Sequence, residues 1–233
     1  MNILAITAHP DDAEILVSGT LAKYQRAGHS VAICIVADGA AGSMVHTPEE
    51  SRAIRREEAK NAATAINADM YWIGEPDANV FDTEASRLKV LDVVRIVKPQ
   101  VVFTHADNDY HADHRATSAI AFAASFNAAL PNIANEHPAV KDIPALFHME
   151  PLGGYGFEPE LFVDISNEIE LKRKALACHV SQLQWLKDLD NVDVNDMMEI
   201  NGRYRGYQAG CRYAECFRQV QMYGRAPAGH LLP

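Results

Sequence analysis

Two short clusters of acidic and histidine residues, about a hundred positions apart, carry the groups that could do chemistry in this 233-residue chain. They are residues 9–14 (HPDDAE) and residues 111–114 (HADH). Each follows an apolar run that is typical of a buried β-strand. Because open α/β sheets bind their ligands at the carboxyl ends of parallel strands, we expect the two clusters to meet at one edge of a sheet.

The first chemistry that these residue types suggest is metal binding. A catalytic zinc site uses three protein ligands, His and carboxylate among them, and leaves a position open for water. His9, Asp12 and His114 meet that count, and we expect them to hold Zn²⁺. A His and Asp set without thiolates could also hold Fe²⁺, Mn²⁺ or Co²⁺. The four cysteines form no C-x-x-C pair, so they indicate neither a zinc site nor an oxidising compartment.

The residues beside these ligands could move protons. Asp11 need not bind the metal, which leaves it free to act as a general base toward water. His111 could lie across the metal from Asp11, stabilise an oxyanion as imidazolium and protonate a leaving amine. Asp113 is a candidate acceptor that orients a histidine and raises its pKa. Glu14, at the start of a predicted helix, is interpreted as structural support.

The elements that must position these residues follow from the hydrophobic pattern. Short apolar runs predict strands at residues 3–8, 31–36, 70–73, 101–105, 145–149 and 161–165. Helical patterns occupy residues 13–27, 48–66 and 85–97, a helix is expected after His114, and residues 168–223 alternate charged and apolar residues in helical fashion. Such alternation predicts an α/β fold with a mostly parallel sheet. No linker divides residues 1–233, so we expect a single domain.

One loop is predicted sharply by the start of the helix that follows it. Residues 47–50 (TPEE) place a threonine N-cap, a proline at the first helical position and a glutamate at the third. Residues 37–46 therefore form a loop at the edge of the sheet that carries the first cluster. This loop could be a wall or lid of a pocket, or a simple connection.

Composition excludes several classes of function. The formal charge is −10, with 31 acidic and 21 basic residues, so the chain as a whole would repel a nucleic-acid backbone. The most apolar long stretch, residues 116–130, is too short to cross a bilayer. The chain enters a strand at once, without a basic and apolar leader, so we expect a cytoplasmic protein that acts on a small molecule.

The two clusters resemble the motifs of the LmbE-like, or PIG-L, family of metal-dependent N-deacetylases. Residues 8–14 are similar to the family's A-H-P-D-D-E motif with one extra residue, and residues 111–116 are similar to its H-x-D-H motif. Further segments look like family elements, at residues 55–59, 75–77, 164–166, 179–182 and 213–217.

The resemblance implies a Rossmann-like three-layer fold and a role for each cluster residue. It implies His9, Asp12 and His114 as zinc ligands, Asp11 as the base and His111 as the electrophilic or acid residue. The implied reaction removes the acetyl group from an N-acetylglucosamine-type conjugate, giving acetate and a free amino sugar. By analogy with the family we expect a homo-oligomer, a trimer or a hexamer.

The resemblance also implies two residues that bind the sugar hydroxyls, Arg55 and Asp77. Arg52 and Arg56 are rivals for the position of Arg55. Arg55 could instead pair with Glu58 on a solvated helix face, and Asp77 could be an ordinary turn residue.

Other polar residues have less specific interpretations. Asn108 and Asp109 could line the pocket or orient a ligand, whereas His105, His148 and His179 are more typical of packed, hydrogen-bonded residues. Residues 150–158, around Tyr155, match no family pattern, which leaves the aglycone open. Residues 230–233 could contact a neighbouring subunit.

Two alternative functions remain at this point. One keeps the metal site and changes the substrate, giving a metal-dependent amidase or hydratase on a non-sugar substrate. The other is a non-catalytic, nucleotide-binding or regulatory Rossmann-like protein. The second is disfavoured because the first turn lacks a G-x-G-x-x-G fingerprint and its two carboxylates would repel a pyrophosphate.

Overall fold

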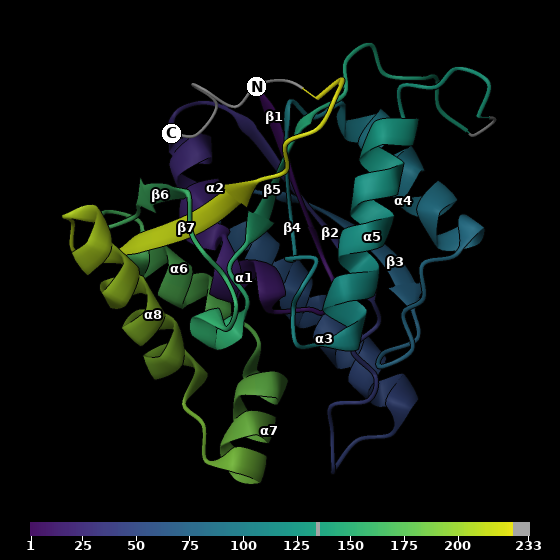
Figure 1. Ribbon diagram of the computed structural model, residues 1–233. Coiled ribbons are helices and arrows are strands. Elements are labelled where there is room, and N and C mark those ends of the chain that lie inside the picture. Colours follow the sequence, from purple (N-terminus) through teal and green to yellow (C-terminus); the bar gives the residue numbers. More distant parts are fainter. Residues whose placement is uncertain (134–135, 226–233) are drawn as a thin grey trace.

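A seven-stranded sheet forms the centre of the computed structural model, which describes residues 1–133 and 136–225 (Figure 1). The strand order is β3-β2-β1-β4-β5-β7-β6. The strands are β1 (Asn2–Thr7), β2 (Ser30–Ala37), β3 (Asp69–Glu75), β4 (Val101–Thr104), β5 (Ala145–Met149), β6 (Leu161–Asp164) and β7 (Ala214–Gln219). Strands β1 to β5 pair in parallel, and β7 runs antiparallel between β5 and β6.

Helices cover both faces of this sheet. They are α1 (Asp12–Leu16), α2 (Ser18–Arg26), α3 (Pro48–Ala65), α4 (Glu84–Val97), α5 (Ala112–Asn127), α6 (Ile169–Leu176), α7 (Val180–Asp190) and α8 (Val194–Ala209), with a short 3₁₀ helix η1 (Leu152–Gly154). Helices α4 and α5 pack on one face, and α1, α2, α3 and α6 pack on the other (Figure 1). The Rossmann-like three-layer fold expected from the sequence is confirmed.

The central strands are apolar throughout because both of their faces are covered. Ile3 and Ala5 point into the core under α2, α3 and α6, whereas Leu4 and Ile6 point into the core under α4 and α5. Burial of alternate side chains in two separate cores explains the continuous apolar runs that predicted the strands.

The strand order places the two clusters at one crevice. From β1 the chain first builds β2 and β3 on one side, and later β4 and β5 on the other side. The carboxyl ends of β1 and β4 are therefore neighbours at the point where the order reverses, which is the usual ligand site of such sheets. The chain leaves β1 toward His9 and leaves β4 toward His111.

The predicted helix start at Thr47 is confirmed, whereas the single helix predicted for residues 13–27 is wrong. Thr47 and Glu50 form a capping box at the start of α3. Residues 13–27 instead form α1 and α2, separated at Val17. The first amides of α2, on Gly19 and Thr20, donate to the Glu215 carboxylate, so a distant residue caps a second helix here.

The helical pattern predicted for residues 168–223, with a polar interruption at residues 188–196, is confirmed for α6, α7 and α8 and is wrong for Ala214–Gln219, which forms β7. This strand takes its hydrogen bonds from β5 and β6, which lie far away in sequence, so no local periodicity announces it. The helix expected after His114 begins earlier, at Ala112. Within the described residues, no helix combines the length and apolar character required to cross a membrane.

Candidate active site

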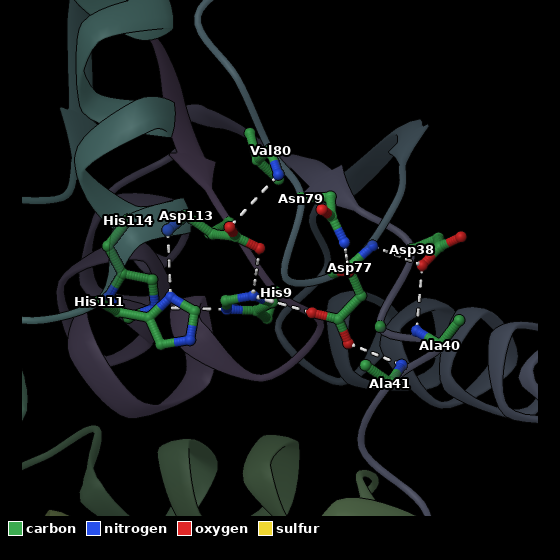
Figure 2. A network of polar contacts seen from close by, with 12 residues as sticks. His9, Asp38, Ala40, Ala41, Asp77, Asn79, Val80, His111, Asp113 and His114 are labelled. Carbon is green, nitrogen blue, oxygen red and sulfur yellow. Dashed lines mark hydrogen bonds and ion pairs between the residues drawn. The ribbon is translucent and has the colours of Figure 1, made fainter.

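The three predicted metal ligands meet at the carboxyl ends of β1 and β4. His114 Nε2 lies 3.3 Å from His9 Nδ1 and 3.4 Å from Asp12 Oδ1. His9 Nδ1 lies 3.5 Å from Asp12 Oδ2. Figure 2 shows the three histidines His9, His111 and His114 grouped around this point. Side chains from two segments a hundred residues apart thus present ligand atoms to one small volume.

The 3.3 Å between His114 Nε2 and His9 Nδ1 suits a tetrahedral divalent ion, and each of these nitrogens lies 3.4–3.5 Å from one oxygen of Asp12. Ligand atoms that lie 2.0–2.1 Å from a tetrahedral zinc are roughly 3.3–3.4 Å from one another. The surroundings are also negative: burial lowers the pKa of His114, yet Asp12 and Asp109 outweigh it and raise that pKa to about 9. A cluster whose carboxylates draw positive charge onto a buried imidazole fits a cation, so His9, Asp12 and His114 suit a divalent metal.

Carboxylates also lie beside the far nitrogens of both histidine ligands. His114 Nδ1 lies 3.1 Å from Asp109 Oδ2. His9 Nε2 lies 3.3 Å from Asp113 Oδ2 and 3.2 Å from Asp77 Oδ1 (Figure 2). Such partners fix the orientation of a ligating imidazole. The structure therefore directs Asp113 at His9, not at its sequence neighbour His111.

His105 belongs to the same cluster, although the sequence suggested only a packed residue. It is buried, and its Nε2 accepts a hydrogen bond from the Ala8 amide at 2.9 Å and lies 3.3 Å from Asp12 Oδ2. Its ring stacks on His114, with centroids 3.9 Å apart. Burial lowers the pKa of His105 to about 4, which keeps the ring neutral. Its position directly after β4 was the signal that could have revealed it.

Asp11 stands in a strained and buried position. Its φ is 125°, a region that residues other than glycine rarely occupy and that clusters at functional sites. Burial raises the pKa of Asp11 to about 6, while Arg55, whose Nη2 is 3.5 Å from Asp11 Oδ2, opposes that rise. A carboxylate with a pKa near neutrality can take up a proton during a reaction and release it again.

His111 caps the N-terminus of α5 and borders the ligand histidines. Its Nδ1 accepts a hydrogen bond from the Asp113 amide, and its ring centroid lies 4.8 Å from those of His9 and His114. Burial, followed by the charges of those two histidines, lowers the pKa of His111. Because Nδ1 accepts the Asp113 amide, Nε2 is left for other partners. The imidazolium form of His111 that was expected from the sequence is not favoured beside His9 and His114.

Arg55 is the arginine of its helix that faces the site. It is buried, and it donates to the Pro10 carbonyl at 2.7 Å and to the Gly39 carbonyl at 3.2 Å. Arg52 pairs instead with Asp38, and Arg56 lies over the Trp72 ring. The alternative of a solvated pair between Arg55 and Glu58 is wrong, since Glu58 accepts two hydrogen bonds from Ser181.

Asp77 links the ligand cluster to the loop of residues 38–47. Besides its contact with His9, Asp77 accepts a hydrogen bond from the Ala41 amide at 3.0 Å (Figure 2). Its carboxylate also lies 4.0 Å from Arg55 Nη1. These contacts lower the pKa of Asp77 to about 2 in spite of its burial. An ordinary exposed turn residue would have none of these partners.

The remaining polar residues either support the structure around the site or lie away from the ligands. Glu14 and His179 face each other at 3.1 Å in the core beneath the site, and Asn108 donates to the Gly156 carbonyl, which ties the 150–158 segment to the loop after β4. Tyr155 in that segment is exposed, and His148 lies away from the ligands, near Asp107. Residues 230–233 lie outside the described residues.

Known proteins resemble this chain over most of its length. A diacetylchitobiose deacetylase of Thermococcus kodakarensis is 29% identical over 232 residues, covering 94% of this chain and 82% of that protein. The conserved protein TT1542 from Thermus thermophilus has a TM-score of 0.81 at 31% identity, covering 97% of this chain and all of that one.

A second solved structure is N,N'-diacetylchitobiose deacetylase from Pyrococcus horikoshii in complex with its inhibitor MPG. Its TM-score is 0.81 at 26% identity, over 94% of this chain and 83% of that chain. The profile of the family described as GlcNAc-PI de-N-acetylase, PIG-L, matches residues 4–125, which is more than half of the chain and includes both clusters. The chain belongs to the PIG-L family, as its two motifs indicated.

Proposed function

We propose that this protein is a zinc-dependent hydrolase that removes the acetyl group from an N-acetylglucosamine-type conjugate. The products are acetate and a free amino sugar. The observation that carries the proposal is the meeting of His9 Nδ1, His114 Nε2 and the Asp12 carboxylate, each nitrogen within 3.5 Å of an Asp12 oxygen, beside the strained and buried Asp11. The deacetylases among its relatives support the reaction and the substrate class.

The proposed mechanism divides the work among the site residues. When bound by His9, Asp12 and His114, the ion supplies Lewis acidity that polarises a carbonyl and acidifies water. Asp11 takes a proton from the attacking water at its carboxylate, and the oxygen of that water bonds to the acetyl carbon. The proton that Asp11 takes up then passes to His111, which gives a proton to the amine nitrogen as the carbon–nitrogen bond breaks. The water is thereby split between acetate and amine.

The other site residues position these groups. Asp113 and Asp77 orient His9, Asp109 orients His114, and Arg55 holds the Asp11 turn through the Pro10 carbonyl. Arg55 and Asp77 are also the proposed contacts for sugar hydroxyls. A cytoplasmic location and a trimeric or hexameric state stay predictions from the sequence, and Fe²⁺, Mn²⁺ and Co²⁺ stay the alternatives to Zn²⁺.

Metal content and acetate release test this function together. Purified protein should contain about one zinc per chain, as a three-ligand site demands, and should release acetate from N-acetylglucosamine derivatives. His114→Ala should lose both metal and activity. Asp11→Ala should keep the metal and lose at least about a hundredfold in kcat, the usual contribution of a general base. Normal turnover by Asp11→Ala would show that the assigned base is wrong.

The same assays include a control variant and distinguish the alternative functions. His29→Ala removes a histidine next to the amino end of the sheet and should leave metal and activity unchanged. Amide or hydratase turnover without acetate release would favour the alternative enzyme on a non-sugar substrate. The non-catalytic nucleotide-binding alternative is disfavoured physically, because a pyrophosphate would meet the buried carboxylates of Asp11 and Asp12.

A further inference from the structure

A cavity of about 670 Å³ adjoins the candidate active site, and apart from Arg55 its lining residues have no part in the mechanism above. It lies between the 38–47 loop, the first turns of α3 and helix α7. Figure 1 shows α7 at the same end of the molecule as the start of α3. The apolar side chains that line it are Met44, Val45, Ile54, Val180 and Trp185. A cavity of this size and character suits a small organic group.

The apolar lining is unusually open to solvent. Met44, Val45 and Val180 are 76%, 83% and 64% exposed, although all three are large hydrophobic residues. A contiguous exposed apolar surface of this kind commonly marks a ligand-binding or interaction site. The Ser43 hydroxyl accepts hydrogen bonds from the amides of Val45 and His46, so the loop holds its apolar side chains in a defined place.

Arg55 connects this cavity to the reacting groups. Its side chain lines the cavity, while its guanidinium lies 3.5 Å from the Asp11 carboxylate. Gly42 packs at the same wall, where an added Cβ would lie 3.4 Å from Arg55 Nη1. Arg55 therefore stands between Asp11 and the apolar space, and the part of a substrate on the far side of Arg55 from Asp11 would occupy that space.

We propose that this cavity binds an apolar aglycone of the substrate, with an aromatic ring as the preferred group. The proposal rests on the deacetylase function proposed above and defines its substrate class further. The Trp185 indole offers a flat apolar surface for a ring, and the Met44 thioether makes favourable contacts with aromatic edges. The preferred substrates are thus N-acetylglucosamine derivatives that carry an aryl group, in place of small or purely polar glycosides.

A comparison of two glycosides tests the proposal. The zinc-loaded enzyme is assayed for acetate release from phenyl and from methyl N-acetyl-β-glucosaminide. Burial of a phenyl ring in an apolar cavity should raise kcat/KM for the phenyl glycoside on the order of tenfold or more. Trp185→Ala and Val45→Ser should each bring that ratio toward one. Val45→Ser changes an exposed loop position and serves if Trp185→Ala fails to fold.

A matched control and a direct binding measurement complete the test. Leu189→Ala truncates an exposed residue of the same helix that does not line the cavity, and its ratio should equal that of the wild type. A wild-type ratio near one, or a ratio that both cavity variants preserve, overturns the proposal.

Failure of the proposed function would be seen separately, as no acetate from either glycoside. In that case calorimetry with phenyl and methyl 2-amino-2-deoxy-β-glucosides tests whether the cavity binds an apolar group. Tighter binding of the phenyl compound by the wild type, lost in Trp185→Ala, supports an apolar ligand site. Equal binding of the two compounds contradicts it.

Discussion

At the scale of single residues, the candidate site contains two histidine rings, His9 and His114. The two nitrogens of each ring have different partners. One nitrogen of each ring faces the candidate metal position, and the other faces a carboxylate: Asp109 for His114, and Asp113 with Asp77 for His9. Because a ligating histidine must keep one nitrogen unprotonated, a carboxylate at the other nitrogen selects the tautomer that can bind. The outer carboxylates therefore matter to metal affinity although they do not bind the ion.

The Asp109 carboxylate gives the clearest test of this arrangement. Asp109→Ala should weaken zinc binding by about tenfold to a hundredfold, the usual effect of removing the partner of a ligating histidine. The dissociation constant is measured by competition with a chromophoric chelator. Asp107→Ala, two positions earlier on the same loop and exposed in its pair with Arg218, is the matched control. Equal affinity of the two variants would refute the role of Asp109.

At the scale of elements, the last strand holds the first helices in place. Glu215 on β7 accepts hydrogen bonds from the first amides of α2 and pairs with the buried Lys172 of α6. Lys172 also donates to the Ile15 carbonyl in α1. A Cβ at Gly19 would lie 2.8 Å from Ile165 Cδ1 and 2.9 Å from Glu215 Oε1, so a larger residue there would displace these side chains. The turn that carries His9 and Asp12 is thus supported from the far end of the chain.

This support predicts a large loss of stability when the carboxylate is removed. Glu215→Ala leaves the Lys172 charge buried without its partner and should lower the free energy of unfolding by about 3–5 kcal/mol. Urea unfolding monitored by circular dichroism measures the change. Glu170→Ala, which removes an exposed carboxylate of an ion pair on α6, should cost less than about 1 kcal/mol. Similar losses in the two variants would contradict the anchoring role of Glu215.

At the scale of the whole molecule, stability should depend on pH through a histidine buried outside the metal cluster. Burial lowers the pKa of His148 to about 4, although Asp107 opposes the shift. The unfolded chain therefore binds a proton at this residue near pH 6.5, where the folded protein does not. The stability that the neutral ring contributes is complete above about pH 6.5 and is lost as the pH falls toward 4.

The expected loss of stability follows from the lowered pKa of His148. Between pH 7.5 and pH 5 the folded protein should lose about 2 kcal/mol of unfolding free energy through His148. His148→Gln should lack this component, so its stability should fall by correspondingly less when urea unfolding is compared at the two pH values. His29→Gln is the control at the surface near the N-terminus. An identical pH dependence in wild type and His148→Gln would assign the loss to other groups.

Local patterns predicted much of this molecule. The apolar runs indicated the first six strands because a strand covered on both faces is apolar along its whole length. The capping box at Thr47 was visible because all of its partners lie within four residues. Contacts over long sequence separations were not visible: β7, the break between α1 and α2, and the contacts of His105 with Ala8 and Asp12 all depend on partners far away in the chain.

The sequence by itself determined the family, the alternation of strands and helices, and the presence of two clusters that could bind a metal and move protons. Only the tertiary structure decided which carboxylate faces which histidine, which arginine reaches Asp11, and where an apolar cavity opens beside it. The physical reason is range: residue type and periodicity specify the backbone locally, whereas a site is made by the ends of strands that meet only after the sheet has formed.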